Sequence, residues 1–254
     1  MTRLHDDVRL AGAYQPGNAM PESSLRAWAE LIASFAPCPA PAVLEIGAGT
    51  GMFCAALARW QRASPVVGVD PSVPMLEQAR RHNAHPGVHY VVGSAEAVPT
   101  RAESFDLALL SRVVHHLPDR PACARELTRV LRPGGVVVIR TTFRERLDAL
   151  VYDYWPQLRA VDEQRFPGRQ EVLADFTRAG FTVREVTSFA QPVTPALRAY
   201  HERMSTRPQS KFSYLTTAEF ETGLRRLARD AASEPASAPW PVPERYDLAA
   251  LALD

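Results

Sequence analysis

Short apolar segments alternate with amphipathic ones between residues 43 and 141, and this alternation constrains the fold more than any other feature of the sequence. The apolar segments are expected strands, and their lack of a polar face is typical of a parallel sheet covered by helices on both sides. Regular alternation of strand and helix predicts a doubly wound α/β fold. The expected strands are 43–46, 65–70, 88–92, 105–110 and 136–141, and the expected helices are 51–61, 74–83 and 119–131.

The pattern changes after residue 141, where helical spacing dominates. Residues 194–232 predict two helices split near 208–214, and this segment is long for a connection between strands. We therefore interpret it as an inserted helical cap. The remaining expected helices are 22–35, 143–164 and 169–179, and the remaining expected strands are 181–187 and 245–253.

Composition and charge argue against several classes of protein. The formal net charge of +1 favours neither nucleic acid nor an anionic membrane as the main partner. The three cysteines, at 38, 54 and 123, lie far apart and lack the spacing of a disulfide framework or a zinc site. No apolar run approaches the roughly 20 residues that span a bilayer, and the N-terminus lacks the apolar stretch of a signal peptide. We expect a cytoplasmic protein with no bound metal.

A glycine-rich turn follows the first expected strand. Gly47, Gly49 and Gly51 let the backbone turn tightly and approach a ligand closely. The next helix directs its free N–H groups and its positive dipole end toward this turn. Asp70 ends the second strand, where a carboxylate can accept hydrogen bonds from ribose hydroxyls. The pattern indicates a nucleotide-like ligand.

Two ligand classes fit this turn. A dinucleotide fingerprint requires a third small residue at the position of Met52, whose side chain is too bulky for that motif. Glu45, just before the glycines, is also an unusual neighbour for a pyrophosphate. These residues favour a nucleoside with a cationic or zwitterionic tail, and a nicotinamide cofactor stays as the alternative.

Five motifs in order resemble the class I S-adenosylmethionine-dependent methyltransferase superfamily. The nearest group is the type 11 methyltransferase domain, similar to enzymes of ubiquinone and menaquinone biosynthesis. The motifs are EIGAGTG at 45–51, GVDPSVPML at 68–76, GSAEAVP at 93–99, FD at 105–106 with SRVVHHLPD at 111–119, and LTRVLRPGG at 127–135. The resemblance is close over 40–141. It implies a Rossmann-like, doubly wound seven-stranded sheet, mostly parallel with an antiparallel last strand, and S-adenosyl-L-methionine as cofactor.

The resemblance also divides the chain into parts. We expect one methyltransferase domain over residues 1–254. Its parts are an N-terminal helical lid at 1–36, a cofactor-binding core at 40–141, cap or substrate segments at 142–168 and 190–232, and C-terminal sheet elements at 169–189 and 244–254.

The same resemblance implies the cofactor contacts. The glycine loop would face the methionyl part, Asp70 the ribose hydroxyls, and Ser94 the adenine. Ser94 stands where the family usually has aspartate, so its hydrogen bond would be neutral rather than charge-assisted. The full expected set is Glu45, Gly47, Ala48, Gly49, Asp70, Pro71, Met75, Ser94, Ala95, Ser111 and Tyr14.

Three residues after the fourth strand are candidate catalytic or acceptor-binding residues. His116 and His115 are candidate general bases, because histidine titrates near neutral pH, and the alternative is that they cap or pack. Arg112 could bind an acceptor carboxylate or merely pair with a surface acid.

We expect methyl transfer to a small, apolar or aromatic metabolite, with a monomer or homodimer and no nucleic-acid or membrane partner. The alternative is a cofactor-binding protein that catalyses another reaction or acts as a regulatory partner.

Overall fold

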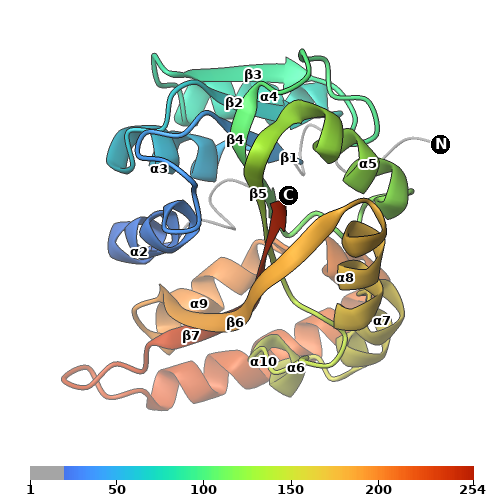
Figure 1. Ribbon diagram of the computed structural model, residues 1–254. Helices are drawn as coiled ribbons and strands as arrows, with labels where there is room; N and C mark the ends of the chain where they lie inside the picture. Colours follow the sequence, from blue (N-terminus) through green and yellow to red (C-terminus); the bar gives the residue numbers. More distant parts are fainter. Residues whose placement is uncertain (1–19) are drawn as a thin grey trace.

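Seven strands form one sheet in the computed structural model, which describes residues 20–254 apart from the side chain of Ser210. Their order across the sheet is β3-β2-β1-β4-β5-β7-β6 (Figure 1). The first five strands pair in parallel, whereas β7 runs antiparallel to both β5 and β6. The predicted fold class is therefore confirmed. The strands are β1 Val43–Ile46, β2 Val66–Asp70, β3 Val88–Val92, β4 Phe105–Ser111, β5 Leu131–Thr141, β6 Phe181–Thr194 and β7 Val242–Leu253.

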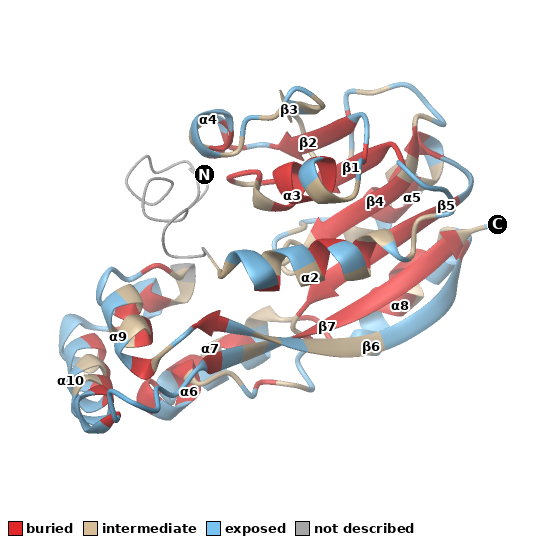
Figure 2. Ribbon diagram, turned by 90° about the vertical axis from the view of Figure 1, so that its left-hand side faces the viewer, coloured by how far each residue is buried: buried red, intermediate tan, exposed pale blue. Residues whose placement is uncertain are grey.

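Helices cover both faces of this sheet, because successive residues of a strand point to opposite sides. Val43 packs with helices α2 (Glu22–Ala33) and α3 (Met52–Trp60), and its neighbour Leu44 packs with α5 (Arg120–Val130) and α8 (Arg169–Arg178). Helix α4 (Val73–His82) contacts β2 and β3. Figure 2 shows β1, β2, β4 and β5 buried over most of their length.

The expected lid at 1–36 lies within the described residues only from position 20. There, α2 packs into the core with Trp28, which is 1% exposed and meets Phe189 edge-on. This helix is therefore packed against one face of the sheet in this structure.

The cap is built from α6 (Val151–Tyr154), α7 (Gln157–Arg165), α9 (Leu197–Ser205), the 3₁₀ helix η2 (Ser210–Tyr214) and α10 (Thr217–Ser233). Trp155 lies at its centre, stacks on Phe220 and donates its indole N–H to the Phe220 carbonyl at 2.9 Å. Residue 223 must be glycine here, since a Cβ atom would lie 2.2 Å from the Trp155 ring nitrogen. The cap therefore has its own apolar core.

Several boundaries differ from the sequence prediction: β5 already begins at Leu131 and β7 at Val242, and two further differences concern the cap. The continuous helix expected at 143–164 is wrong: Leu150 precedes the short helix α6, and Pro156 begins the separate helix α7, because proline cannot donate a backbone hydrogen bond inside a helix. Strand β6 continues past residue 187 to Thr194, since its partner β7 starts at Val242 and pairs along its whole length. This long ribbon carries the cap beside the sheet (Figure 1). Within residues 20–254, no helix is long and apolar enough to cross a membrane.

Candidate functional site

The glycine turn runs through the left-handed region of backbone conformation, which glycine adopts readily. Gly47, Gly49 and Gly51 all have positive φ angles, of 67°, 53° and 77°. A side chain at Gly47 would meet Val113, and one at Gly51 would meet Tyr90, at 2.4 and 2.2 Å. The turn therefore depends on glycine for both conformation and space.

Asp70 holds this turn in place. Its carboxylate accepts hydrogen bonds from the backbone N–H of Gly49 and of Ser72, both at 2.8 Å. Gly93, which follows β3, donates its N–H to the Asp70 carbonyl at 3.2 Å. The ends of β1, β2 and β3 thus meet at one edge of the sheet, as parallel strands require.

A first cavity opens beside the glycine turn. Its lining includes Glu45, Gly47, Ala48, Gly49 and Ser111, all of them expected cofactor contacts. The other expected contacts lie close by, at the ends of β2 and β3, without lining this cavity. Met75 and Ala95 are buried there, Ser94 is half-buried and Pro71 is exposed. Tyr14 lies outside the described residues.

Glu45 is a buried carboxyl at the wall of the first cavity. The Cys54 thiol donates to it at 2.9 Å. Burial raises the pKa of Glu45 from its usual 4.5 to about 8, and the Cys54 hydrogen bond and the Arg140 charge oppose this shift. Glu45 is therefore mostly protonated at neutral pH until a positive charge approaches it.

Arg140 is the cationic counterpart of Glu45 in the same cavity. It is 2% exposed, and its guanidinium lies 3.8 Å from the ring centre of Tyr246 and 4.4 Å from that of Trp28. Its Nη1 donates to Ser111 Oγ at 3.2 Å, while its Nε has no hydrogen-bond partner among the described residues. Burial lowers the pKa of Arg140 to about 10, so it stays charged at neutral pH.

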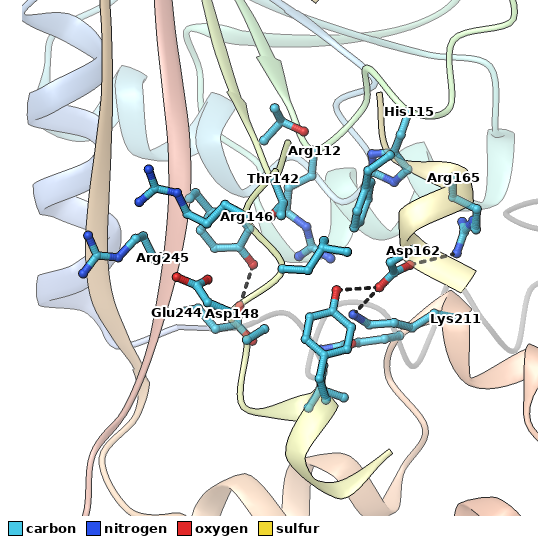
Figure 3. Close-up of a pocket in the computed structure, with 18 of the residues that line it drawn as sticks. Arg112, His115, Thr142, Arg146, Asp148, Asp162, Arg165, Lys211, Glu244 and Arg245 are labelled. Carbon is cyan, nitrogen blue, oxygen red and sulfur yellow. Dashed lines mark hydrogen bonds and ion pairs between the residues drawn. The ribbon is translucent and has the colours of Figure 1, made fainter. Parts of the chain in front are cut away.

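A second cavity adjoins the first and shares Arg112, Glu244 and Tyr246 with it. It lies between the β4–α5 loop, the end of β5 and the cap (Figure 3). Part of its wall is apolar, formed by Leu147, Val151 and Phe166. Its charged lining comprises Arg112, Arg146, Asp148, Asp162, Arg165, Lys211, Glu244 and Arg245. The cavity is thus mixed in character and carries both signs of charge.

A buried ion pair forms the cap side of the second cavity. Lys211 Nζ and the Tyr152 hydroxyl both donate to Asp162 Oδ2, each at 2.8 Å (Figure 3). Asp162 is 1% exposed, and the Lys211 side chain is 14% exposed. Burial lowers the pKa of Lys211, and the Asp162 charge opposes this shift.

The predicted acceptor residues line this second cavity. Arg112 sits directly after β4 with a positive φ of 56°, an unfavourable conformation for arginine that places it at the junction of the two cavities. His115 is half-buried and packs edge-on against Phe166, with ring centres 4.7 Å apart. His116 is exposed, and its ring centre lies 4.0 Å from that of His115.

Several lining residues were not predicted from the sequence. Arg140, Tyr246 and Glu244 come from β5 and β7, and Asp162 and Lys211 come from the cap. One feature of the sequence could have drawn attention to Lys211, because it is the only lysine in the chain. The other four have no motif around them and are brought together only by the fold.

Known proteins match this core. Residues 44–139 match the family model for a methyltransferase domain. A demethylmenaquinone methyltransferase of Roseiflexus castenholzii is 34% identical over 149 residues, which are 58% of this chain and 63% of that protein. A malonyl-(acyl-carrier protein) O-methyltransferase of Salmonella typhimurium is 41% identical over 111 residues, 42% of this chain and 41% of that protein. The chain matches less than two thirds of the length of these relatives.

The fold extends the similarity over more of the chain. A crystal structure of a candidate methyltransferase from an antibiotic biosynthesis pathway of Anabaena variabilis superposes with a TM-score of 0.72 at 24% identity. The superposition covers 89% of this chain and 98% of the other. The cap and the C-terminal strands therefore belong to a fold that a solved structure shares.

Proposed function

We propose that the protein transfers a methyl group from S-adenosylmethionine to a small-molecule metabolite, because residues 44–139 match the family model for a methyltransferase domain. The single observation that carries the proposal is the pair of adjoining cavities, one at the glycine turn and one under the cap, with Arg112 at their junction. Donor and acceptor can thus be held side by side within one enclosed site.

The first cavity suits the amino-acid tail of the cofactor. Glu45 offers a carboxyl to an ammonium group, and Arg140 offers unused N–H donors to a carboxylate. Both side chains are buried, and a buried polar or charged group without a hydrogen-bond partner costs free energy. A zwitterionic tail would give a partner to each of the two groups. Asp70, already fixed by the backbone of the turn, is positioned for the ribose.

The second cavity is proposed to hold the acceptor. Its apolar wall of Leu147, Val151 and Phe166 suits the apolar or aromatic body expected from the sequence. S-adenosylmethionine supplies an activated methyl group on a positively charged sulfur. The chain itself then has to align the acceptor, exclude water and, where the acceptor must lose a proton, accept that proton.

His115 is the better-placed base of the two candidate histidines. It is more enclosed than His116 and points into the second cavity, and Phe166 fixes the orientation of its ring (Figure 3). We assign proton acceptance to His115 and a supporting position to His116.

An assay with the labelled cofactor and a panel of small hydroxylated and amino metabolites tests this proposal. Methyl transfer to at least one compound, lost when Arg112 is replaced by methionine, is the expected result. Tight cofactor binding without methyl loss on a compound that is nevertheless converted would favour the alternative, a non-methyl-transfer reaction. Absence of cofactor binding would contradict both.

A further inference from the structure

Three buried oxygen atoms in the second cavity lack hydrogen-bond partners within the described part of the chain. They are Thr141 Oγ1, Asp162 Oδ1 and Gln209 Oε1. Thr141 is fully buried, and Arg165 Nη1 lies 3.8 Å from Asp162 Oδ1, beyond hydrogen-bond distance. Buried polar atoms in native proteins are nearly always satisfied, so several in one cavity indicate a polar occupant.

Two cations face the same space. Arg112 enters from the β4–α5 loop, and Lys211 enters from the cap beside Asp162 (Figure 3). They lie close enough for the charge of Arg112 to contribute to lowering the pKa of Lys211. An anion between them would relieve this repulsion.

A lysine at position 211 suits the binding of an anion in this cavity. Every other basic side chain among the 29 lysines and arginines is arginine. An ammonium has three N–H donors on one compact atom, whereas a guanidinium is a wide planar fork. Lys211 uses one donor on Asp162 in the described contacts, which leaves the ammonium able to reach a ligand at the same time.

We propose that the second cavity binds the acceptor by a polar end, with a carboxylate of the acceptor between Arg112 and Lys211 and a hydroxyl or amine of the acceptor against Gln209 and Asp162. This inference rests on the proposed function and names its substrate class, a small hydroxy or amino carboxylic acid. Asp162 and Tyr152 act as positioning residues that hold the Lys211 ammonium at the cavity wall.

Matched probes test the charge requirement without turnover. The full chain, saturated with S-adenosylhomocysteine, is titrated by calorimetry and ligand-observed NMR with 4-hydroxyphenylacetate and with 4-hydroxyphenylacetamide. The two probes differ only at one end, which is a charged carboxylate in the acid and a neutral carboxamide of nearly the same size in the amide. A charge-assisted hydrogen bond predicts about tenfold tighter binding of the acid than of the amide.

The variant carrying Lys211→Met together with Asp162→Asn removes the ion pair without leaving a buried charge alone. It is expected to lower the preference for the acid to about threefold, because Arg112 alone then faces the carboxylate, while the control Arg125→Met, on the exposed face of α5, keeps the tenfold preference. Equal binding of acid and amide by the unaltered chain, failure of both probes to bind, or a tenfold preference that is unchanged in the double variant would overturn the inference.

The cofactor measurement separates this inference from the proposed function. If S-adenosylhomocysteine binds and the acid preference is missing, only the substrate class is wrong. If S-adenosylhomocysteine does not bind, the proposed function fails, and the same titration on the ligand-free chain still decides whether the cavity selects an anion.

Discussion

The guanidinium of Arg140 lies 3.8 Å from the ring centre of Tyr246, so that a strand in the middle of the sheet presents a buried cation on an aromatic face. Trp28 from α2 and Phe53 from α3 complete the aromatic surroundings, at 4.4 and 5.1 Å. In this arrangement no carboxylate forms a salt bridge with Arg140 among the described residues, although its charge is near enough to Glu45 to oppose the rise in the pKa of that carboxyl. A buried cation stabilised mainly by ring faces can still form strong hydrogen bonds with an incoming anion.

Replacing Arg140 by methionine should therefore weaken binding of S-adenosylhomocysteine by about 10- to 100-fold, the value of one charge-assisted hydrogen-bond pair. Binding of 5′-methylthioadenosine, which lacks the amino-acid tail, should change little. Calorimetry on both ligands measures this difference, with Arg125→Met as the control. An equal loss for the two ligands would mean that Arg140 only supports the fold.

Cofactor binding should also depend on pH through Glu45. Its pKa is raised to about 8, so the carboxyl of the ligand-free protein is mostly protonated below pH 8. Binding an ammonium group favours the ionised form and releases this proton, and affinity should rise by up to about tenfold per pH unit as the pH approaches 8. Calorimetry in buffers of different ionisation enthalpy counts the proton released.

The variant Glu45→Gln is the control for this pH effect, because the amide cannot ionise. It should bind S-adenosylhomocysteine weakly and with no pH dependence between 6 and 8, a range set by the shifted pKa. If the slope persists in Glu45→Gln, another group is responsible.

The cofactor half of the site could be predicted from the sequence because its chemistry is local. Gly47, Gly49 and Gly51 lie within one turn, and Asp70 ends the next strand, so strand-and-turn logic alone brings them together. The seven-stranded sheet and its antiparallel last strand followed from the resemblance and are confirmed by the structure.

Arg140 in the first cavity and the charged residues of the second cavity could not be predicted in the same way. Arg140 and Tyr246 are 106 positions apart and lie on neighbouring antiparallel strands, a pairing that no short motif records. Lys211 and Asp162 meet only because η2 packs against α7 in the cap. The expectation of an apolar or aromatic acceptor followed from the predicted helical cap. The structure shows that Trp155, a large aromatic residue of this cap, is fully buried in the core of the cap.

Two glycines with nearly the same backbone conformation test whether the glycine turn excludes a side chain for lack of space. Gly51 and Gly134 have nearly equal φ angles, 77° and 76°, but a Cβ atom at Gly51 would lie 2.2 Å from the Tyr90 hydroxyl, whereas one at Gly134 would meet nothing within 4 Å. Gly134→Ala should cost about 1 kcal/mol of unfolding free energy from backbone strain alone, and Gly51→Ala about 3 kcal/mol because overpacking is added. Urea unfolding measures both. Equal costs would show that Tyr90 moves aside freely, although its hydroxyl donates to the Asn83 carbonyl at 2.8 Å.

The adjacent histidines provide the test of proton transfer. His115 is half-buried, points into the second cavity and is oriented by Phe166, whereas His116 is exposed at the cavity rim. If His115 accepts the acceptor's proton, His115→Asn should lower kcat by about 100-fold or more, which is the usual contribution of a general base. His116→Asn should lower kcat much less, because His116 is exposed to solvent and no aromatic contact with Phe166 orients its ring in the described residues.

Both variants should leave the affinity for S-adenosylhomocysteine unchanged, since neither histidine lines the first cavity. The activity of His115→Asn should recover as the pH is raised, because an acceptor that ionises in solution no longer needs a base. A merely structural role for His115 would lower kcat at every pH alike, and a larger effect at His116 would reverse the assignment.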